Sequence, residues 1–346
     1  AVDKHGMAPC KATCPAGTSV QGLVALVAID RPDRALAVSR KANPFTGSCG
    51  TLCDHPCEAS CSRQMVDSPL AIRRLEAYIS EVERAQMRKR RVRRPRATRQ
   101  ERVAIVGAGP AGLTAAIDLV RLGYSVQVFE AQDAPGGSLK IEVDEGRLSR
   151  AVLSQDLEWI AAMGVHVHTG QRIDDLAALH ATYDAIILAT GQATLDSPPP
   201  SGCRPGENGH ILCNDLPYVV IAGAAAHGPG ALATVVGQGH SAAEAVHRAL
   251  SSESVSLPSA SLMLDVAIPD RRDIAKRLAS GQSARHGRLD VETEAAPQLP
   301  TAAAQAEAQR CLACGGCAEC SLCLDVCKAG AIDHSLKETY STLNVG

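Results

Sequence analysis

The 346 residues are enough for one large hydrophobic core with one or two small satellite domains. Hydrophobic residues make up 45% and charged residues 21%, which is typical of soluble globular proteins, and the net charge of -2 argues against nucleic acid as a partner. No stretch has the length of a membrane span, and the first residues lack the apolar run of a signal peptide. We therefore expect a cytoplasmic protein without membrane insertion.

In chain order, residues 1–83 predict a small helical domain. Apolar residues at helical spacing predict helices over 20–29, over 35–42 and from 69 through 79. Residues 84–102 form a dense basic run, which we interpret as a solvated linker. Docking of this run onto an acidic partner is the alternative.

From residue 103 onward, short apolar runs alternate with helical patterns. This alternation predicts an α/β Rossmann-like domain over 103–250, with a parallel sheet and crossover helices. Residues 251–305 are rich in Ser, Ala and Pro and predict a linker or irregular segment, and 306–346 form a short cysteine-rich segment. The expected strands are 103–106, 125–129, 165–168, 185–188 and 218–222, and the expected helices are 110–122, 153–163 and 233–250.

Cysteine is the most informative residue type in the sequence. Most of the 14 cysteines fall into one run near each end, while Cys203 and Cys213 stand apart and are interpreted as ordinary thiols. In a reducing compartment, crowded thiols favour metal ligation over the alternative of a disulfide framework. The candidate metal ligands are Cys10, Cys14, Cys49, Cys53, Cys57 and Cys61 in the first run and Cys311, Cys314, Cys317, Cys320, Cys323 and Cys327 in the second.

A dinucleotide fingerprint follows the first predicted strand. Gly107, Gly109 and Gly112 form a GxGxxG motif at the start of a helix, whose unpaired N–H groups would face a pyrophosphate. Glu130 closes the next strand, where its carboxylate can accept hydrogen bonds from a ribose. Strand, helix and acidic residue together predict a bound dinucleotide.

The stretch VAIVGAGPAGLTAAIDLVRLGYSVQVFE resembles the FAD site of the glutamate synthase small-subunit family of flavoproteins. The family's later markers also occur, as an Ala-Thr-Gly segment and as VVIAGAAAHGPGALATVVGQGHSAAEAV. The resemblance implies FAD binding by Gly107, Gly109, Pro110, Ala111, Gly112, Glu130, Gly136, Gly137, Ala189, Thr190, Gly191, Gly223 and Ala224.

Two features depart from this family. Relatives carry an Asp at the position of Ala224, where the carboxylate helps to hold FAD. Relatives also insert a second Rossmann unit for NAD(P)H, but only about 27 residues separate Gly191 from Val219, and one βαβ unit takes roughly 30. The sequence therefore predicts a variant that lacks the nicotinamide domain.

The first cysteine run, CKATCPAG followed by NPFTGSCGTLCDHPCEASC, resembles the iron–sulfur domain that precedes FAD in the same family and in dihydropyrimidine dehydrogenase. The resemblance implies that Cys14, Cys53 and Cys57 hold the cluster nearest FAD, with Glu76 as fourth ligand. A surface Glu76 paired with Arg73 or Arg74 is the alternative. The other three cysteines of this run remain for a second site or as spare thiols, and zinc is the rival metal.

The second run contains Cys317-x2-Cys320-x2-Cys323-x3-Cys327, which is the bacterial ferredoxin spacing. Either Cys327 closes the same cluster, or Cys311, Cys314 and Cys327 hold another one with an outside ligand. A rubredoxin-like or zinc site is the alternative. Together the two runs predict two or three [4Fe–4S] clusters.

These features predict an oxidoreductase subunit that passes electrons between FAD and iron–sulfur clusters, with no catalytic acid or base of its own. The expected partners are other subunits of a redox complex, either catalytic or ferredoxin-like. By resemblance these include a glutamate synthase large subunit, a 2-oxoacid oxidoreductase, a formate dehydrogenase or a hydrogenase. The alternatives are a complete FAD enzyme that reacts with NAD(H) or NADP(H) at the flavin, and a scaffold that has lost its cofactors.

Overall fold

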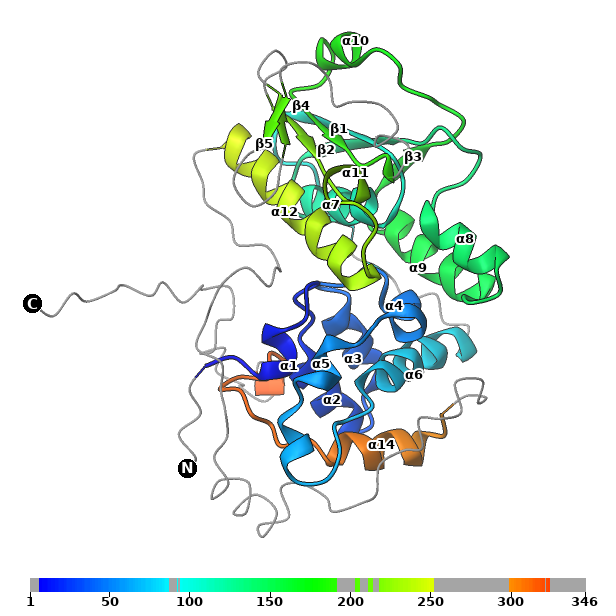
Figure 1. Cartoon of the computed structure of the whole chain (residues 1–346), viewed down its shortest axis with the longest axis vertical. Helices are drawn as coiled ribbons and strands as arrows, with labels where there is room; N and C mark the ends of the chain where they lie inside the picture. Colours follow the sequence, from blue (N-terminus) through cyan, green and yellow to red (C-terminus); the bar gives the residue numbers. More distant parts are fainter. Residues whose placement is uncertain are drawn as a thin grey trace, which may run out of the picture.

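The computed structural model describes residues 6–86, 92, 94–191, 203–205, 211–213, 218–251, 299–320 and 322–323, and for 203–205 and 211–213 the backbone alone. Cys327 and nearly all of the segment predicted at 251–305 lie outside the described residues, as does part of the basic run. Two lobes are visible in Figure 1, one of helices and one built on a sheet. In the described parts of the chain, every helix is too short or too polar to traverse a lipid bilayer.

Short helices make up the first lobe. Proline, whose fixed φ suits the first turn of a helix, begins α1, α3 and α5. Leu23, Leu36 and Leu75 are fully buried in the core that these helices share. The elements are α1 (Pro9–Ala12), α2 (Val20–Ala28), α3 (Pro32–Ser39), α4 (Thr46–Leu52), α5 (Pro56–Ala59), the 3₁₀ turn η1 (Ser62–Met65) and α6 (Ile72–Ala85).

The helix expected from residue 69 begins instead at Ile72, because two glutamates from elsewhere bind the backbone at this point. Glu307 accepts a hydrogen bond from the Ala71 N–H at 2.8 Å, and Glu58 accepts one from the Arg73 N–H at 2.9 Å. These bonds satisfy N–H groups that the first turn of a helix leaves unpaired. The helix runs on to Ala85, past the domain boundary predicted at residue 83.

A helix from the C-terminal part of the chain completes this lobe. Helix α14 (Thr301–Gln309) packs against α2 and α6, as Figure 1 shows, and the predicted boundary between residues 305 and 306 falls inside it. Ala304 and Ala308 are buried in the same core as Leu23 and Leu75. The two cysteine-rich ends of the sequence therefore lie in one lobe.

In the described residues, the second lobe is a seven-stranded sheet in the order β3-β2-β1-β4-β7-β6-β5, whose first five strands are parallel. Ile105 pairs with Val128 on one side and with Ile187 on the other, so the sheet centre is apolar. This is the predicted Rossmann-like arrangement. The strands are β1 (Arg102–Val106), β2 (Ser125–Phe129), β3 (His166–His168), β4 (Ala185–Leu188), β5 (Cys203–Pro205), β6 (Ile211–Cys213) and β7 (Val219–Ile221).

Helices connect and cover the parallel strands. Helix α7 links β1 to β2, and α12 packs along α7. Between β4 and β7 the described backbone holds the antiparallel pair β5–β6. The helices are α7 (Pro110–Arg121), α8 (Ser138–Asp144), α9 (Arg150–Ala162), α10 (Leu176–His180), α11 (Ala224–His227) and α12 (Leu232–Leu250).

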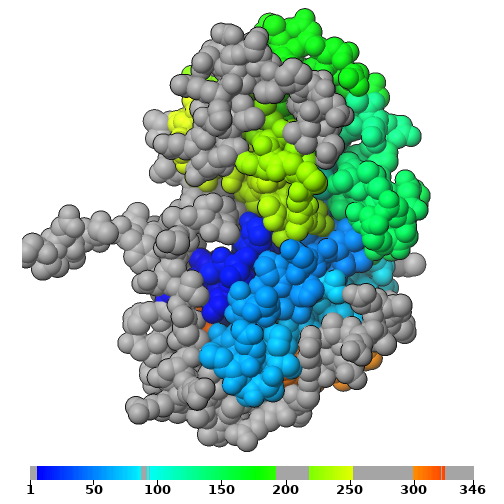
Figure 2. All heavy atoms as spheres, viewed as in Figure 1, coloured from blue at the N-terminus to red at the C-terminus, as the bar shows by residue number. Residues whose placement is uncertain are grey.

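The lobes share a continuous core. Phe45 of the helical lobe is fully buried together with Val236 of α12, and Figure 2 shows the yellow-green segment after β7 lying directly on the blue helical lobe. The His240 ring on α12 contacts Asp118 Oδ2 on α7 at 2.5 Å and the Ala42 carbonyl of the helical lobe at 2.6 Å. These buried contacts fix the carboxyl ends of the strands relative to the cysteines.

Candidate dinucleotide and iron–sulfur sites

Two glycines of the fingerprint are required by packing. Gly107 has a φ of 107°, and a Cβ built on it would lie 2.3 Å from the Ala189 carbonyl oxygen. A Cβ on Gly112 would lie 2.1 Å from the carbonyl oxygen of Gly107. These glycines therefore let β1, β4 and the first turn of α7 approach closely.

Gly109 has a different environment. The nearest atom to a Cβ built there is Gly137 Cα, at 3.8 Å. Gly137, with a φ of 52°, and Gly136 bring a second glycine-rich turn opposite Gly109, and Pro110 and Ala111 start α7 beside it. The space in front of Gly109 thus meets the N-terminus of a twelve-residue helix, where N–H groups and the helix dipole favour a phosphate.

Glu130 lies at the end of β2 and is held in place by backbone groups. Its Oε2 accepts a hydrogen bond from the Ala108 N–H at 2.8 Å, and its Oε1 accepts one from the Gln132 N–H at 2.9 Å. A carboxylate oxygen can accept more than one hydrogen bond, so lone pairs remain for ribose hydroxyls. This geometry suits the role that the fingerprint predicts.

The remaining predicted dinucleotide residues follow β4 and β7 at the same edge of the sheet. Ala189 donates its N–H to the Val106 carbonyl at 2.8 Å, and Gly191 and Gly223 both have positive φ. Thr190 Oγ1 is buried and has no hydrogen-bond partner among the described residues. A buried hydroxyl in this state fits a site that a polar ligand completes. Ala224 begins α11 and offers only its backbone.

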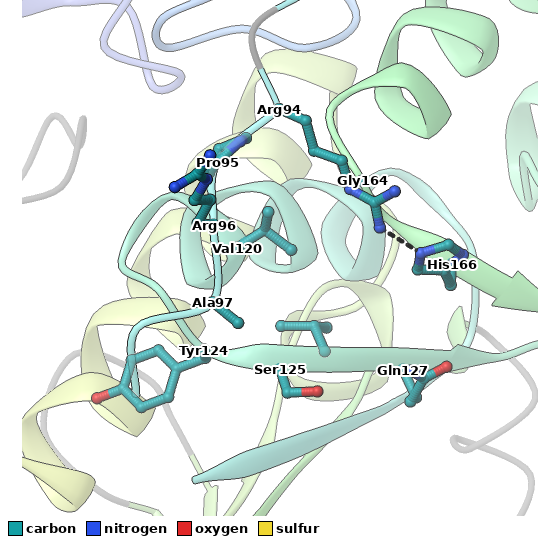
Figure 3. Close-up of a pocket in the computed structure, with 11 residues that line it drawn as sticks. Arg94, Pro95, Arg96, Ala97, Val120, Tyr124, Ser125, Gln127, Gly164 and His166 are labelled. Atoms are coloured by element: carbon teal, nitrogen blue, oxygen red, sulfur yellow. Dashed lines mark hydrogen bonds between the residues drawn. The ribbon is translucent and has the colours of Figure 1, made fainter. Parts of the chain in front are cut away.

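A separate cavity lies elsewhere in the described structure. It has a volume of about 710 Å³ and lies at the amino ends of β2 and β3, under the segment that precedes β1. Figure 3 shows Arg94 reaching across it to the His166 ring at 2.5 Å. Ligands of open α/β sheets bind at the carboxyl ends of the strands, so this cavity is not the dinucleotide site.

Four buried thiols surround Glu76 in the helical lobe. We call Cys14, Cys49, Cys53, Cys57 and Glu76 the inner set. Burial raises the pKa of each of the four thiols, and the Glu76 carboxylate is the next largest cause in every case, which places it close to all of them. The structure thus brings Cys49, which the sequence analysis left unassigned, to the site predicted for Cys14, Cys53 and Cys57.

Glu76 is 7% exposed, so the alternative of a surface glutamate is wrong. Burial, and then the charge of Glu58, raises the pKa of its carboxyl to about 8. Among the described residues its carboxylate has no hydrogen-bond or ion-pair partner, and nearby thiols rather than cations surround it. A buried acid next to buried thiols is a donor set suited to a thiophilic metal centre.

The other described cysteines fall outside the inner set. Cys10 and Cys61 lie with Cys311 and Cys314 from the second run, and we call these four the outer set. Cys317 is exposed, and Cys320 and Cys323 are partly exposed. Over the described ranges, no three His, Cys, Asp or Glu side chains converge as closely as the ligands of one metal ion. A cubane distributes its ligands over four iron atoms instead.

Comparison with known proteins matches each lobe to a family. Residues 4–88 match the family described as dihydropyrimidine dehydrogenase domain II, 4Fe-4S cluster. Residues 105–175 match the NAD(P)-binding Rossmann-like domain family. The helical domain that precedes the Rossmann-like domain is therefore a 4Fe-4S cluster domain.

Curated relatives carry the same pair of domains. The NADP(+)-dependent formate dehydrogenase subunit beta of Moorella thermoacetica is 34% identical over 53% of this chain and 29% of its own length. The NAD-dependent dihydropyrimidine dehydrogenase subunit PreT of Salmonella typhimurium is 32% identical over 54% and 46%, respectively. Glutamate synthase [NADH] of Schizosaccharomyces pombe is 33% identical over 51% of this chain and 9% of its own.

The chain is a homologue of these oxidoreductases. The predicted resemblance to the glutamate synthase small-subunit type is confirmed, as is the fold class. The matched region spans less than half the length of each of these relatives.

Sequence reasoning missed the buried charges that hold the second cysteine run. Arg310 directly precedes Cys311, and neither its side chain nor that of Glu307 is exposed. The sequence does show a Glu and an Arg three residues apart, directly before a cysteine. Spacing alone, however, does not distinguish a buried ion pair from a surface ion pair.

Proposed function

We propose that the chain is an FAD- and [4Fe–4S]-containing electron-transfer subunit of a multi-subunit oxidoreductase. One observation carries this proposal: Cys14 and Cys53 of the inner set are buried in the same core as Ala108 and Ala111, which form the fingerprint turn. The carbonyl of Pro15, which follows Cys14, and the carbonyl of Ala111 both pack closely on α12, against Gly237 and Gly239. A cluster at the inner set and a dinucleotide at the fingerprint would therefore be neighbours, with protein between them.

This proximity favours FAD at the fingerprint. An iron–sulfur cluster exchanges one electron at a time, whereas a nicotinamide transfers a hydride and so two electrons together. A flavin does both, and is therefore the dinucleotide cofactor that can exchange electrons with an adjacent cluster. The Rossmann-like fold accepts either dinucleotide, and it is the neighbouring thiols that argue for FAD.

The side chains and backbone of this chain would bind and orient the cofactors. Gly109 leaves room for the pyrophosphate, the first N–H groups of α7 donate to it, and Glu130 accepts from a ribose hydroxyl. The inner thiols would ligate a cluster as thiolates, with Glu76 available as an oxygen ligand. Burial of Cys14 and Cys49 keeps water away from this region.

The partner would be a catalytic or ferredoxin-like subunit that supplies or receives the electrons. The names of two relatives describe them as subunits of a formate dehydrogenase and of a dihydropyrimidine dehydrogenase. We propose a cytoplasmic location, because a reducing compartment keeps thiols available for ligation.

A second candidate is a complete FAD enzyme that reacts with NAD(H) or NADP(H) directly at the flavin. The match of residues 105–175 to an NAD(P)-binding family favours it, as do the relatives whose names include NAD, NADH or NADP. In this case a nicotinamide would bind over the flavin without a second Rossmann unit.

Anaerobic purification of the full chain tests both candidates. The expected result is about one FAD per chain together with iron and acid-labile sulfide, and bleaching of the flavin absorbance on addition of dithionite. Rapid bleaching by NADH or NADPH alone would favour the complete enzyme. A protein that contains neither flavin nor labile sulfide after anaerobic preparation and reconstitution would contradict the proposal.

A further inference from the structure

A small apolar pocket in the helical lobe is lined by four cysteines from opposite ends of the sequence. Cys10 follows the start of α1, Cys61 follows α5, and Cys311 and Cys314 follow α14. The rest of its lining is largely aliphatic, from Val20, Val24, Leu70, Ile72 and Leu312. Next to burial, the charges that most raise the pKa of the Cys10 thiol are those of Cys311, Cys61 and Cys314, in that order.

Buried ion pairs fix the backbone immediately before Cys311. Arg63 donates to the Arg310 carbonyl oxygen at 2.7 Å and to Asp67 Oδ2 at 2.6 Å. Arg310 donates to Glu307 at 2.6 Å and to Asp67 Oδ1 at 2.9 Å. Arg63 is 1% exposed and Arg310 is fully buried, so these contacts make the approach of the C-terminal segment to η1 part of the core.

The backbone after Cys314 is also docked on the N-terminal helices. The Gly315 N–H donates to Gln21 Oε1 at 2.7 Å, and the Ser19 hydroxyl donates to the Ala318 carbonyl at 3.1 Å. A Cβ on Gly22 would lie 2.2 Å from that same carbonyl oxygen, so only glycine allows this approach. Contacts on both sides of Cys311 and Cys314 therefore hold them at the pocket.

The same backbone turn occurs after Cys311, Cys53 and Cys317. The N–H of Ala313 donates to Cys311 Sγ at 3.4 Å, and Ala313 has a φ of 47°. In the inner set, the N–H of His55 donates to Cys53 Sγ at 3.4 Å, with a φ of 46° at His55. Non-glycine residues rarely adopt this conformation, and N–H groups directed at sulfur are a feature of cluster-binding thiolates.

We propose that Cys10, Cys61, Cys311 and Cys314 together hold a [4Fe–4S] cluster, so that the C-terminal segment completes a site begun by the N-terminal domain. This inference rests on the proposed function and adds to it a second cluster with a defined ligand set. The four thiolates supply one ligand for each iron, and the aliphatic lining limits solvent access. Neither cysteine run alone contains the set.

The test uses the full chain purified without oxygen and its single Cys→Ala variants. We expect Cys10→Ala, Cys61→Ala and Cys314→Ala each to lose the same electron paramagnetic resonance (EPR) signal of the dithionite-reduced protein, with about four iron atoms and four sulfides per chain. Cys203→Ala is the matched control, because it removes a thiol that belongs to neither cysteine run. The control should keep that signal.

Alkylation of the unmodified chain gives a measurement that needs no variant. Iodoacetamide should spare the outer set in the cluster-loaded protein, and the four thiols should become reactive together as a chelator removes iron. Cys10 and Cys314 becoming reactive at separate stages would overturn the proposal. So would loss of different signals in Cys10→Ala and Cys314→Ala, or one zinc ion without labile sulfide at these thiols.

The two proposals fail in distinguishable ways. Absence of flavin and of all labile sulfide in the unmodified protein contradicts the proposed function. If flavin and clusters are present, but Cys314→Ala does not affect the EPR signal that Cys10→Ala removes, only the outer set is contradicted.

Discussion

At the scale of single residues, the three glycines of one motif meet two different physical demands. Gly107 and Gly112 are surrounded by backbone that leaves no room for a Cβ, whereas a Cβ on Gly109 would meet only Gly137 Cα at 3.8 Å. Gly109 also has a φ of -81°, which any residue can adopt. The motif therefore combines two positions that serve packing with one that we assign to the ligand.

Gly109→Ala should separate ligand binding from folding. Its methyl group would meet only Gly137 Cα, at an ordinary van der Waals distance of 3.8 Å, and would project toward the proposed pyrophosphate position, so we expect FAD affinity to fall about tenfold, or about 1.4 kcal/mol. The thermal unfolding midpoint of the flavin-free protein should stay unchanged. Fluorescence titration with FAD and calorimetry provide the two readouts.

Gly112→Ala is the matched control for this prediction. Its methyl group would lie 2.1 Å from the Gly107 carbonyl oxygen, so this variant should lower the unfolding midpoint itself. If Gly109→Ala binds FAD as tightly as the unmodified protein, Gly109 does not adjoin the pyrophosphate.

Sequence spacing predicted the position of a single site residue better than it predicted which distant residues lie next to one another. The fingerprint placed Glu130 correctly at the end of β2, because a local βα unit determines that position. Spacing could not group Cys49 with Glu76, or Cys61 with Cys314, because those contacts depend on how helices far apart in the sequence pack. Whether these groups ligate clusters remains the prediction that the variants test.

At the scale of elements, the bounds of two strands were predicted correctly, whereas one helix was predicted with the wrong bounds and another was not predicted. The strands predicted at 125–129 and 185–188 have the bounds of β2 and β4. Strand β4 is an apolar run that is buried throughout, and β2 alternates between buried and half-buried residues, so both show a strand pattern. The helix predicted at 35–42 begins three residues earlier, at Pro32. Helix α4 was not predicted, since its sequence TGSCGTL is poor in helix formers and tertiary contacts stabilise it.

Asp156 of α9 supplies one of those contacts. Its carboxylate accepts hydrogen bonds from the Ser48 N–H at 2.9 Å, the Ser48 hydroxyl at 2.8 Å and the Gly47 N–H at 3.3 Å. These are donors in the first turn of α4, so a residue distant in sequence acts as the N-cap of that helix. Asp156 thereby ties the position of Cys49 to the Rossmann-like lobe.

Asp156 should make the stability of the protein depend on pH. Burial raises its pKa from near 3.8 to about 6, against the opposing effect of the Ser48 bonds. The folded state thus binds a proton more tightly than the unfolded state, and the stability that Asp156 contributes is full below about pH 4 and falls as the pH rises to 6. Asp156→Asn lacks this titration and should cost about 1–2 kcal/mol through impaired capping.

We therefore expect the difference in unfolding midpoint between the unmodified protein and Asp156→Asn to shrink as the pH rises from about 4 to about 6. Thermal unfolding under anaerobic conditions measures it. Glu158→Gln, on the exposed face of the same helix, is the matched control and should show no such trend. A difference that grows with pH would contradict the assigned protonation of Asp156.

At the scale of the whole molecule, two short helices connect the inner and outer sets. Cys10 and Cys14 are four residues apart at α1, and Cys57 and Cys61 are four residues apart at α5. Four residues correspond to about one helical turn, or roughly 5.4 Å along the axis. Helices α1 and α5 also contact each other, and each carries or is followed by one thiol of the inner set and one of the outer set. The proposed order of redox centres is outer cluster, inner cluster and flavin.

This spacing should be visible as magnetic coupling between the clusters. Two reduced clusters whose ligands lie one helical turn apart are close enough for their unpaired spins to interact. We expect the fully reduced protein to give a broadened, split EPR spectrum that relaxes rapidly. Cys314→Ala, which removes the outer cluster, should leave the narrower spectrum of the inner cluster alone, and Cys203→Ala should leave the coupling intact. The alternative outcome is that Cys314→Ala loses one signal while the remaining signal keeps the shape it has in the unmodified protein. In that case the two clusters do not interact, and the proposed electron path through α1 and α5 is wrong.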